Sequence, residues 1–209
     1  MLRCDGDRVV IVGGGIAGAL LAKTLQNHAD VVLIDPKEYF EIPWANVRAK
    51  VEPTVVERTV IPHADYLTDA KVVTASAVGV DDSVVLTSIG RTVGYDFLHL
   101  RVGRLKNVFA IGDITDVPEA KQGYLAQRHA MVVSRNLRLL LRSAGPEHKL
   151  HRYKASKAAI TVTLGRRDAV SELPFMSLIG HIPGVVKPRD LYVSRTRRMM
   201  GIKGKNGES

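Results

Sequence analysis

The sequence predicts an α/β fold, and three features of its 209 residues predict it. A β-branched run at Arg8–Val12 enters a glycine cluster, and a stretch of good helix formers follows. A second apolar run, Val31–Ile34, ends at Asp35. A third, Asn107–Ile111, runs into Gly112 and Asp113. The order strand, glycine turn, helix, strand and acid makes a βαβ unit, which is typical of a Rossmann-like domain with parallel strands.

The elements between these runs are predicted from composition and periodicity. Residues 37–70 contain Pro43, Pro53 and Pro62 and most of the aromatic residues of the first half, so irregular or partly helical structure is expected there. Lys71–Val80, Ser83–Thr87 and about Thr92–Leu98 favour a small β meander, with the first turn at Asp81-Asp82.

The second half of the chain is predicted to contain one long helix and a short α+β segment. Apolar spacing predicts a helix from Gln122 to Arg142, and alternation predicts a strand at Ala159–Leu164. The Gly/Lys-rich tail from Met199 to Ser209 is expected to be frayed.

Composition narrows the class of protein. Apolar residues make up 45% of the chain, the usual share for a globular protein, and no apolar run reaches the length of a membrane span. Cys4 is the only cysteine in the sequence, so an internal disulfide is excluded and a reducing compartment is favoured. The N-terminus enters the first strand without room for a signal peptide.

The formal charge of +9 is concentrated in the second half of the chain. Residues 101–209 hold 21 Lys/Arg against 8 Asp/Glu, whereas residues 1–100 hold 9 against 13. Such a basic half could face a dinucleotide, an anionic membrane or nucleic acid, or it could be a solvated surface. No nucleic-acid recognition motif accompanies it, so no nucleic-acid partner is expected. The basic tail, Lys187 to Lys205, suits peripheral membrane contact, with a disordered charged end as the alternative.

The glycine cluster fits the dinucleotide-binding pattern G-x-G-x-x-G at Gly13, Gly15 and Gly18. The first glycine permits a tight turn, the second lets the backbone approach a pyrophosphate, and the third lets helix and strand pack closely. Asp35 stands where a carboxylate can accept hydrogen bonds from ribose hydroxyls. The alternatives are a glycine turn without a ligand and a simple carboxylate at a strand end.

The glycine pattern alone allows NAD or FAD, and the second Gly-Asp element favours FAD. A strand that ends in Gly112-Asp113 can place Asp113 on the ribityl chain of a flavin, while Gly112 allows a close backbone approach. The alternative for Asp113 alone is an ordinary turn aspartate. Tyr153 to Lys157 also fits the Y-x-x-x-K of short-chain dehydrogenases, but the glycine spacing of that family is missing, so this function is rejected. The seven histidines have no metal-ligand spacing, and no metal site is expected.

Five stretches of the chain match one group of proteins in order: VVIVGGGIAGALLAKTL, VVLIDPKEYFEIPWANVRA, YDFL, NVFAIGDITDVPEAKQGYLAQRHA and LPFMSLIGHIPG. They resemble the apoptosis-inducing-factor-like flavoproteins, and more closely the ferroptosis-suppressor branch and its plant homologues. The resemblance implies bound FAD and electron transfer from NAD(P)H to a quinone or a similar acceptor.

The resemblance has one gap. In this family a complete nicotinamide-binding domain, with its own G-x-G-x-x-G, separates the two halves of the FAD domain. This sequence has no second G-x-G-x-x-G, and after Tyr95–Leu98 it continues with His99-Leu100-Arg101-Val102 instead of an Ala-Thr-Gly strand end. We therefore expect residues 1–145 to form the FAD-binding domain, with its halves joined near residues 98–101 and the inserted domain absent. Residues 146–209 are expected to form a C-terminal segment with a basic tail.

The resemblance also implies roles for individual residues. Gly13, Gly15, Ile16, Ala17 and Gly18 would hold the FAD pyrophosphate, Asp35 and Lys37 the adenosine end, and Asp113 the ribityl chain. Arg48 matches a position near the cofactor, with a solvent-facing arginine as the alternative. Lys121 and Gln122 precede the long helix, whose N-terminus would face the pyrimidine end of the flavin. Tyr124 opens the same helix, and simple helix packing is expected for it, with a place near the flavin as the alternative.

No side chain is assigned a catalytic role, because a flavin carries the chemistry of hydride transfer. The sequence therefore predicts an FAD-dependent oxidoreductase whose NAD(P)H oxidation is impaired by loss of the nicotinamide domain. The alternatives are a non-catalytic truncated isoform that binds FAD or a partner, and a chain that no longer folds stably. A cytoplasmic location is expected, with peripheral membrane contact.

Overall fold

The computed structural model describes residues 7–99, 107–142, 150–156, 160–164, 167–173, 175–182 and 191–202. The chain forms two compact units. The first comprises Met1–Glu41, Val60–Asp116 and Lys121–Tyr153, and the second comprises Ile42–Thr59, Val117–Ala120 and Lys154–Ser209. The boundaries of these units differ from those of the domains expected from the sequence, residues 1–145 and 146–209. The expected division into these two domains stays a prediction.

The centre of the first unit is a parallel sheet. The described residues give it the strand order β10-β9-β1-β2-β5. All four strand pairs are parallel, with Val9 opposite Val31 and Phe97 on its two sides. The strands are β1 (Arg8–Val12), β2 (Asp30–Asp35), β5 (Lys71–Thr74), β9 (Phe97–His99) and β10 (Val108–Phe109). Near-continuous apolar runs form β1 and β2 because both faces of this sheet are buried.

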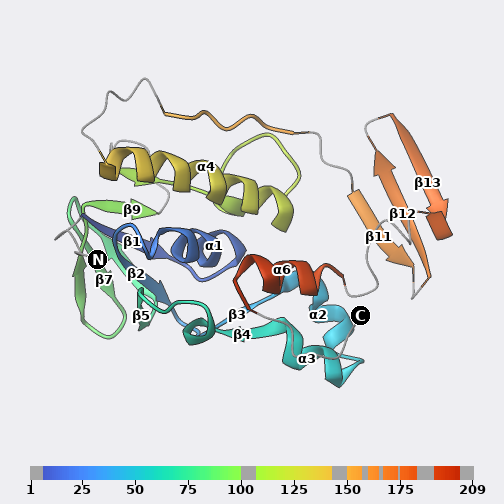
Figure 1. Ribbon diagram of the computed structural model, residues 1–209, viewed down its shortest axis with the longest axis horizontal. Helices are drawn as coiled ribbons and strands as arrows, with labels where there is room; N and C mark the ends of the chain where they lie inside the picture. Colours follow the sequence, from blue (N-terminus) through green and yellow to red (C-terminus); the bar gives the residue numbers. More distant parts are fainter. Residues whose placement is uncertain are drawn as a thin grey trace. The chain divides into compact units, whose positions relative to one another are not determined.

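Two helices cover one face of this sheet (Figure 1). Helix α1 (Ile16–Leu25) is buried on almost all sides, and helix α4 (Gly123–Arg142) packs along it with one apolar stripe. Ile11 points to the α1 side, since its Cγ2 would lie 3.3 Å from a Cβ added at Gly18. The second apolar run of the sequence thus follows a crossover helix, which confirms the predicted α/β fold.

A β meander covers the opposite face. It consists of β6 (Ala77–Val80), β7 (Val84–Thr87) and β8 (Thr92–Gly94), which pair antiparallel. Its Val85 and Val93 join one buried cluster with side chains of the parallel sheet, among them Val10 and Val32. The first unit therefore has three layers: helices, parallel sheet and meander.

The meander is shorter than the sequence predicted. The expected strand Lys71–Val80 is broken at Ala75-Ser76, and its first half is β5, which pairs with β2 in the parallel sheet. The expected strand Thr92–Leu98 is also broken, and Phe97–His99 becomes β9 beside β1. Both predictions were wrong for the same reason, because strand pairing is decided by distant partners that local alternation does not reveal.

An unusually short connection joins two neighbouring parallel strands. Strand β10 pairs parallel with β9, with Val108 opposite Leu98. Only residues 100–107 lie between the end of β9 and the start of β10. A parallel pair normally needs a crossover of a dozen residues or more, usually with a helix. The predicted join near residues 98–101 lies mostly within residues 100–106, outside the described part of the chain.

A small hairpin leads to the next element of the first unit. Strands β3 (Tyr39–Glu41) and β4 (Val60–Pro62) pair antiparallel, with the buried Phe40 opposite Ile61. The short helix η2 (His63–Asp65) follows directly after β4. The backbone N–H of His63 donates to the Glu38 carbonyl over 2.9 Å, so this helix starts at a fixed place beside the end of β2.

The second unit contains the short α+β segment that the sequence predicted. It is built from η1 (Pro43–Ala45), α2 (Asn46–Ala49), α3 (Pro53–Thr59), the antiparallel strands β11 (Ile160–Leu164), β12 (Asp168–Leu173) and β13 (Met176–Gly180), and α6 (Val193–Met199). The Trp44 indole N–H donates to the Leu191 carbonyl over 2.7 Å and ties α6 to η1. The expectation of a frayed tail from Met199 was wrong at its start, because Met200 is fully buried; residues 203–209 lie outside the described part. No described helix is long and apolar enough to cross a membrane.

Replacement of Gly18 by alanine should destabilise the first unit. An added Cβ would lie 1.9 Å from the Gly13 carbonyl oxygen, a contact that only backbone movement can relieve. We expect G18A to lower the free energy of unfolding by at least about 2 kcal/mol in urea titrations. In the matched variant G79A, the nearest atom would be 3.7 Å away, and the change should stay within about 0.5 kcal/mol. Equal stability of the two variants would contradict the close packing at Gly18.

Candidate functional site

The glycine turn at the end of β1 has the geometry that its sequence pattern predicts. Gly13 has a φ of +97°, which disfavours other residues, and its N–H donates to the Ile34 carbonyl at the end of β2 over 2.8 Å. Gly15 is exposed, and a Cβ built on it would meet no atom within 4 Å. The turn therefore leaves open space at Gly15, while Gly18 packs tightly against Gly13.

The first turn of α1 lies directly behind this space. Gly15 is the N-cap, and Ile16, Ala17 and Gly18 are the first three residues of the helix. The first N–H groups of a helix lack partners within it, and they carry the positive end of the helix dipole. No acidic residue lies in this first turn to neutralise them. The turn and helix can therefore receive an anionic group such as a pyrophosphate.

Asp35 ends β2 beside the same turn. Its Oδ2 accepts the backbone N–H of Gly14, and its Oδ1 accepts the backbone N–H of Lys37 over 2.8 Å. Two N–H groups thus fix the carboxylate at the carboxyl edge of the sheet. The Lys37 ammonium is engaged elsewhere, because it pairs with Glu41 over 2.6 Å, and this hydrogen bond raises the pKa of Lys37. Its predicted contact with the adenosine end stays a prediction.

The second half of the sequence brings its Gly-Asp element to the same edge. Gly112 and Asp113 lie in η3 (Gly112–Ile114), directly after β10. Gly112 has a φ of +78°, and a Cβ on it would lie 3.4 Å from the Ala17 Cβ. Asp113 is exposed. Because the strands are parallel, their carboxyl ends share one edge, so the glycine turn, Asp35 and Asp113 gather there.

His129 on α4 holds this Gly-Asp turn in place. The buried Gly112 N–H donates to the His129 Nδ1 over 3.0 Å. The ring of Tyr153 meets the His129 ring edge-on, with centroids 4.1 Å apart. The sequence reasoning missed His129, because a histidine in the middle of a long helix gives no local sign that it accepts a backbone N–H from another element.

The residues before α4 lie where the sequence placed them. Lys121 and Gln122 precede the first helical residue, Gly123. The Lys121 ammonium donates to the Thr115 carbonyl, and the Gln122 carbonyl accepts the N–H groups of Leu125 and Ala126. Tyr124 lies in the first turn of α4 with 53% of the residue exposed.

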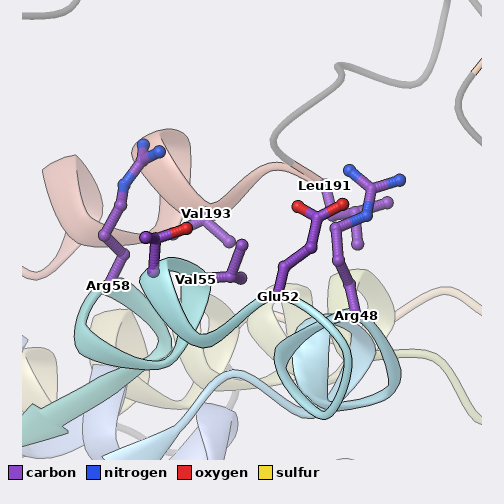
Figure 2. A pocket seen from close by; sticks show the side chains of 7 residues that line it. Arg48, Glu52, Val55, Arg58, Leu191 and Val193 are labelled. Atoms are coloured by element: carbon purple, nitrogen blue, oxygen red, sulfur yellow. The ribbon is translucent and has the colours of Figure 1, made fainter.

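Arg48 belongs to the second unit, where it lines a pocket of about 290 Å³ (Figure 2). The pocket combines charged side chains with an apolar floor, and its lining residues are Arg48, Glu52, Thr54, Val55, Arg58, Leu191 and Val193. The structure describes Arg48 only within this unit, so its predicted contact with a cofactor stays a prediction.

Two residues beside the glycine turn were not predicted at all. His63 and Tyr66 are both buried, and the His63 Nδ1 lies 2.6 Å from the Tyr66 hydroxyl. The His63 ring packs on Gly14, which is a variable position in the glycine pattern. In the sequence, the two residues stand just after the segment that forms β4, and they match no known motif. Nothing in the sequence therefore indicated that they form a pair. Within the described residues, no group of three or more His, Cys, Asp or Glu is placed to hold a metal ion.

These observations fit an adenine dinucleotide. The open space at Gly15 and the first turn of α1 suit its phosphates, and the Asp35 carboxylate suits a ribose. Asp113 offers a second carboxylate at the same edge. The described geometry brings the glycine turn, Asp35 and Asp113 to one edge of the sheet, and the contacts of the predicted residues with a cofactor stay predictions.

Comparisons with known proteins agree with this reading of the motifs. No family model matches the chain. It is 25% identical to human ferroptosis suppressor protein 1 over 92% of this chain and 60% of that protein. It is 28% identical to apoptosis-inducing factor homolog A of Dictyostelium discoideum over 48% of this chain and 24% of that protein. It is 33% identical to the FAD-dependent oxidoreductase FVFD30 of Flammulina velutipes over 46% of this chain and 30% of that protein.

Among solved structures, the chain resembles the sulfide:quinone oxidoreductase of Aquifex aeolicus at 21% identity and a TM-score of 0.38, over 63% of this chain and 32% of that one. This structural likeness is too distant to support a function. The chain spans at most about three fifths of the length of the curated relatives named above. The sequence matches nevertheless support the resemblance of this chain to the apoptosis-inducing-factor-like and ferroptosis-suppressor proteins that its motifs indicate.

Proposed function

We propose that this chain binds FAD at the carboxyl edge of its parallel sheet, as a flavoprotein of the oxidoreductase class named in its relatives. The observation that carries the proposal is the contact between the two halves of the site. A Cβ built on Gly112 would lie 3.4 Å from the Ala17 Cβ, so the Gly-Asp turn comes close to the first turn of α1. A glycine turn, a ribose-binding carboxylate and a Gly-Asp turn are thereby assembled on one edge, although the connection between β9 and β10 is short.

The protein residues would bind and orient the cofactor, which when bound supplies the redox chemistry. The N–H groups at the start of α1 would hold the pyrophosphate, and Asp35 would accept ribose hydroxyls. Asp113 would accept hydroxyls of the ribityl chain. The N-terminal turn of α4, after Lys121 and Gln122, would face the pyrimidine end of the flavin.

The short β9–β10 connection supports the absence of an inserted nicotinamide domain. In the resembling family this domain enters between the same two strands. Here residues 100–107 span the whole connection. Eight extended residues reach about 26 Å, far enough to return along a short strand. The two insertion points of a domain lie close together, so its removal can leave the host domain folded.

The proposed activity of the family is NAD(P)H oxidation with a quinone or similar acceptor. In this chain we expect that activity to be weak, because no second glycine turn is present to hold a nicotinamide against the flavin. The alternative is a non-catalytic isoform that binds FAD or a protein partner. Turnover with NAD(P)H and a quinone separates the two.

The proposed location is cytoplasmic, with peripheral contact to an anionic membrane through basic residues near the C-terminus. Helix α6 supplies Arg195, Arg197 and Arg198. Arg197 also donates to the Arg58 carbonyl over 3.3 Å, so part of this charge has a structural role. Residues 187–190 and 203–205 of the predicted basic tail lie outside the described part of the chain.

The purified chain should bind one FAD, and Asp113 should contribute to its affinity. Fluorescence titration of the flavin-free protein should show about tenfold weaker binding for D113A, because a hydrogen bond to a charged group is lost. Asp82 lies exposed in the turn between β6 and β7, so D82A is the matched control and should bind like the parent chain. Equal affinities of D113A and D82A would contradict the assigned role of Asp113.

The hydrogen bond from Gly112 to His129 should matter for FAD binding through the Gly-Asp turn. H129N keeps an acceptor near the position of Nδ1 and should retain most of the affinity. H129L leaves the buried Gly112 N–H without an acceptor and should bind FAD about tenfold more weakly. Thermal unfolding of both variants provides the stability control. If H129N and H129L bind FAD equally well, His129 does not position this turn.

Stopped-flow reduction of the FAD-loaded chain by NADH should be slow. Without a nicotinamide site, the observed rate should rise linearly with NADH concentration and should not saturate in the millimolar range. Chemical reduction by dithionite serves as the control that the flavin is accessible and redox-active. A rate that saturates at micromolar NADH would overturn the proposed loss of the nicotinamide site.

A further inference from the structure

His63 carries a polar atom that the fold leaves without a partner. The residue is 1% exposed, and its Nε2 makes no hydrogen bond with any described residue. Buried polar groups in folded proteins are almost always hydrogen-bonded, since an unpaired one costs free energy. The described part of the chain shows no other buried side-chain nitrogen or oxygen in this state. The unpaired Nε2 lies next to the glycine turn that is proposed to bind a dinucleotide, so a functional explanation is sought.

The unpaired edge of the ring lies between the glycine turn and the ribose-type carboxylate. A Cβ built on Gly14 would lie 2.8 Å from the His63 Cε1, 2.9 Å from its Nε2 and 3.0 Å from the Asp35 Cγ. The imidazole edge and the carboxylate therefore converge on one point. A side chain at position 14 would therefore displace the His63 ring and press on the Asp35 carboxylate.

The hydrogen-bond partner of Nδ1 determines which nitrogen holds the proton. Burial raises the pKa of Tyr66, so its hydroxyl keeps its hydrogen. The partner recorded for this hydroxyl is the His63 Nδ1 at 2.6 Å, and an O–H that donates to Nδ1 leaves the ring hydrogen on Nε2. The neutral ring thus carries its N–H on the edge that lies beside Gly14, where the Asp35 carboxylate is also close.

The neutral form of His63 is favoured by its surroundings. Burial lowers the pKa of His63, while the Asp35 carboxylate and the Lys37 carbonyl oppose this effect. Although the Lys37 carbonyl favours the charged ring, Nε2 makes no hydrogen bond with any described residue. The Nε2–H is therefore not used in a hydrogen bond to any described residue.

We propose that His63 is a positioning residue of a ribose subsite: its Nε2–H attracts the Asp35 carboxylate and so holds this carboxylate where it can accept a hydrogen bond from a ribose hydroxyl of an adenine dinucleotide. This inference rests on the proposed dinucleotide site. A carboxylate can accept about four hydrogen bonds. The N–H groups of Gly14 and Lys37 use two of these positions, which leaves room for a ribose hydroxyl. Because His63 is buried, its Nε2–H does not contact the ligand, and His63 influences ligand binding through the position of Asp35.

The test uses ADP as the probe, since it carries the ribose and phosphates without the flavin. Calorimetry compares ADP with 2′-deoxy-ADP and 3′-deoxy-ADP on the full chain. In the parent chain, ADP should bind about tenfold tighter than at least one of the two analogues, because Asp35 then loses its hydroxyl partner. The readout is the ratio between the affinity for ADP and the affinity for each deoxy analogue. A general loss of stability would weaken the binding of all three ligands alike and would leave these ratios unchanged.

Variants of His63 distinguish the role of Nε2 from the role of Nδ1. H63N keeps an acceptor for Tyr66 but has no donor at the place of Nε2, and H63L has neither. In both, the preference for ADP should fall below about threefold. H63Q can bring an N–H close to the place of Nε2 and should keep most of the preference. L137A, in the buried face of α4, lowers stability away from Asp35 and should leave the ratio unchanged.

The outcomes distinguish this inference from the proposed function. If the parent chain binds neither ADP nor FAD, the proposed site itself fails. If it binds both and prefers ADP over a deoxy analogue, but H63N or H63L keeps that preference, the role of His63 is overturned while the site stands. Loss of the preference in a folded variant that lacks the donor, with retention in H63Q, is the result that the proposal predicts.

Discussion

The close approach of Gly112 to Ala17 is the contact on which the candidate site depends. It joins a turn that follows β10 to the first turn of α1, and these segments belong to different halves of the sequence. The φ of Gly112 is +78°, a conformation that favours glycine, and the N–H of this glycine is held by His129 from α4. Because α4 in turn packs along α1, the contact, the helix pair and the sheet edge stabilise one another.

The parallel pairing of β9 and β10 links this geometry to function. In the resembling family the two strands are separated in sequence by a whole nicotinamide domain, and here by eight residues. The proposed absence of the nicotinamide domain would leave this strand pair in place and would make binding and catalysis separable. Such a chain would keep the residues that hold a flavin and would lose those that bring a nicotinamide to it, which is why the two proposed roles differ in turnover alone.

Local signals predicted the parts of the structure that local interactions determine. Strand β1, the glycine turn, α1, β2 and α4 follow from apolar periodicity, glycine geometry and helix propensity, and the sequence predicted all of them. The split of Lys71–Val80 between two sheets and the pairing of β9 with β1 depend on partners far away in the chain, so no local pattern could reveal them. His63 and His129 act through Gly14 and Gly112, and tertiary contacts of this kind leave no trace in a motif. Arg48, by contrast, was assigned by resemblance alone.

Amide hydrogen exchange at Gly112 tests most directly whether the two halves close into one site. If they do, the Gly112 amide should exchange with about the same opening free energy as Ala19 in α1, because both belong to one cooperative unit. Added FAD should slow the exchange of both amides together. A Gly112 amide that exchanges at the rate of an unstructured peptide, while Ala19 stays protected, would show that the Gly-Asp turn is not held against the glycine turn and would contradict the account.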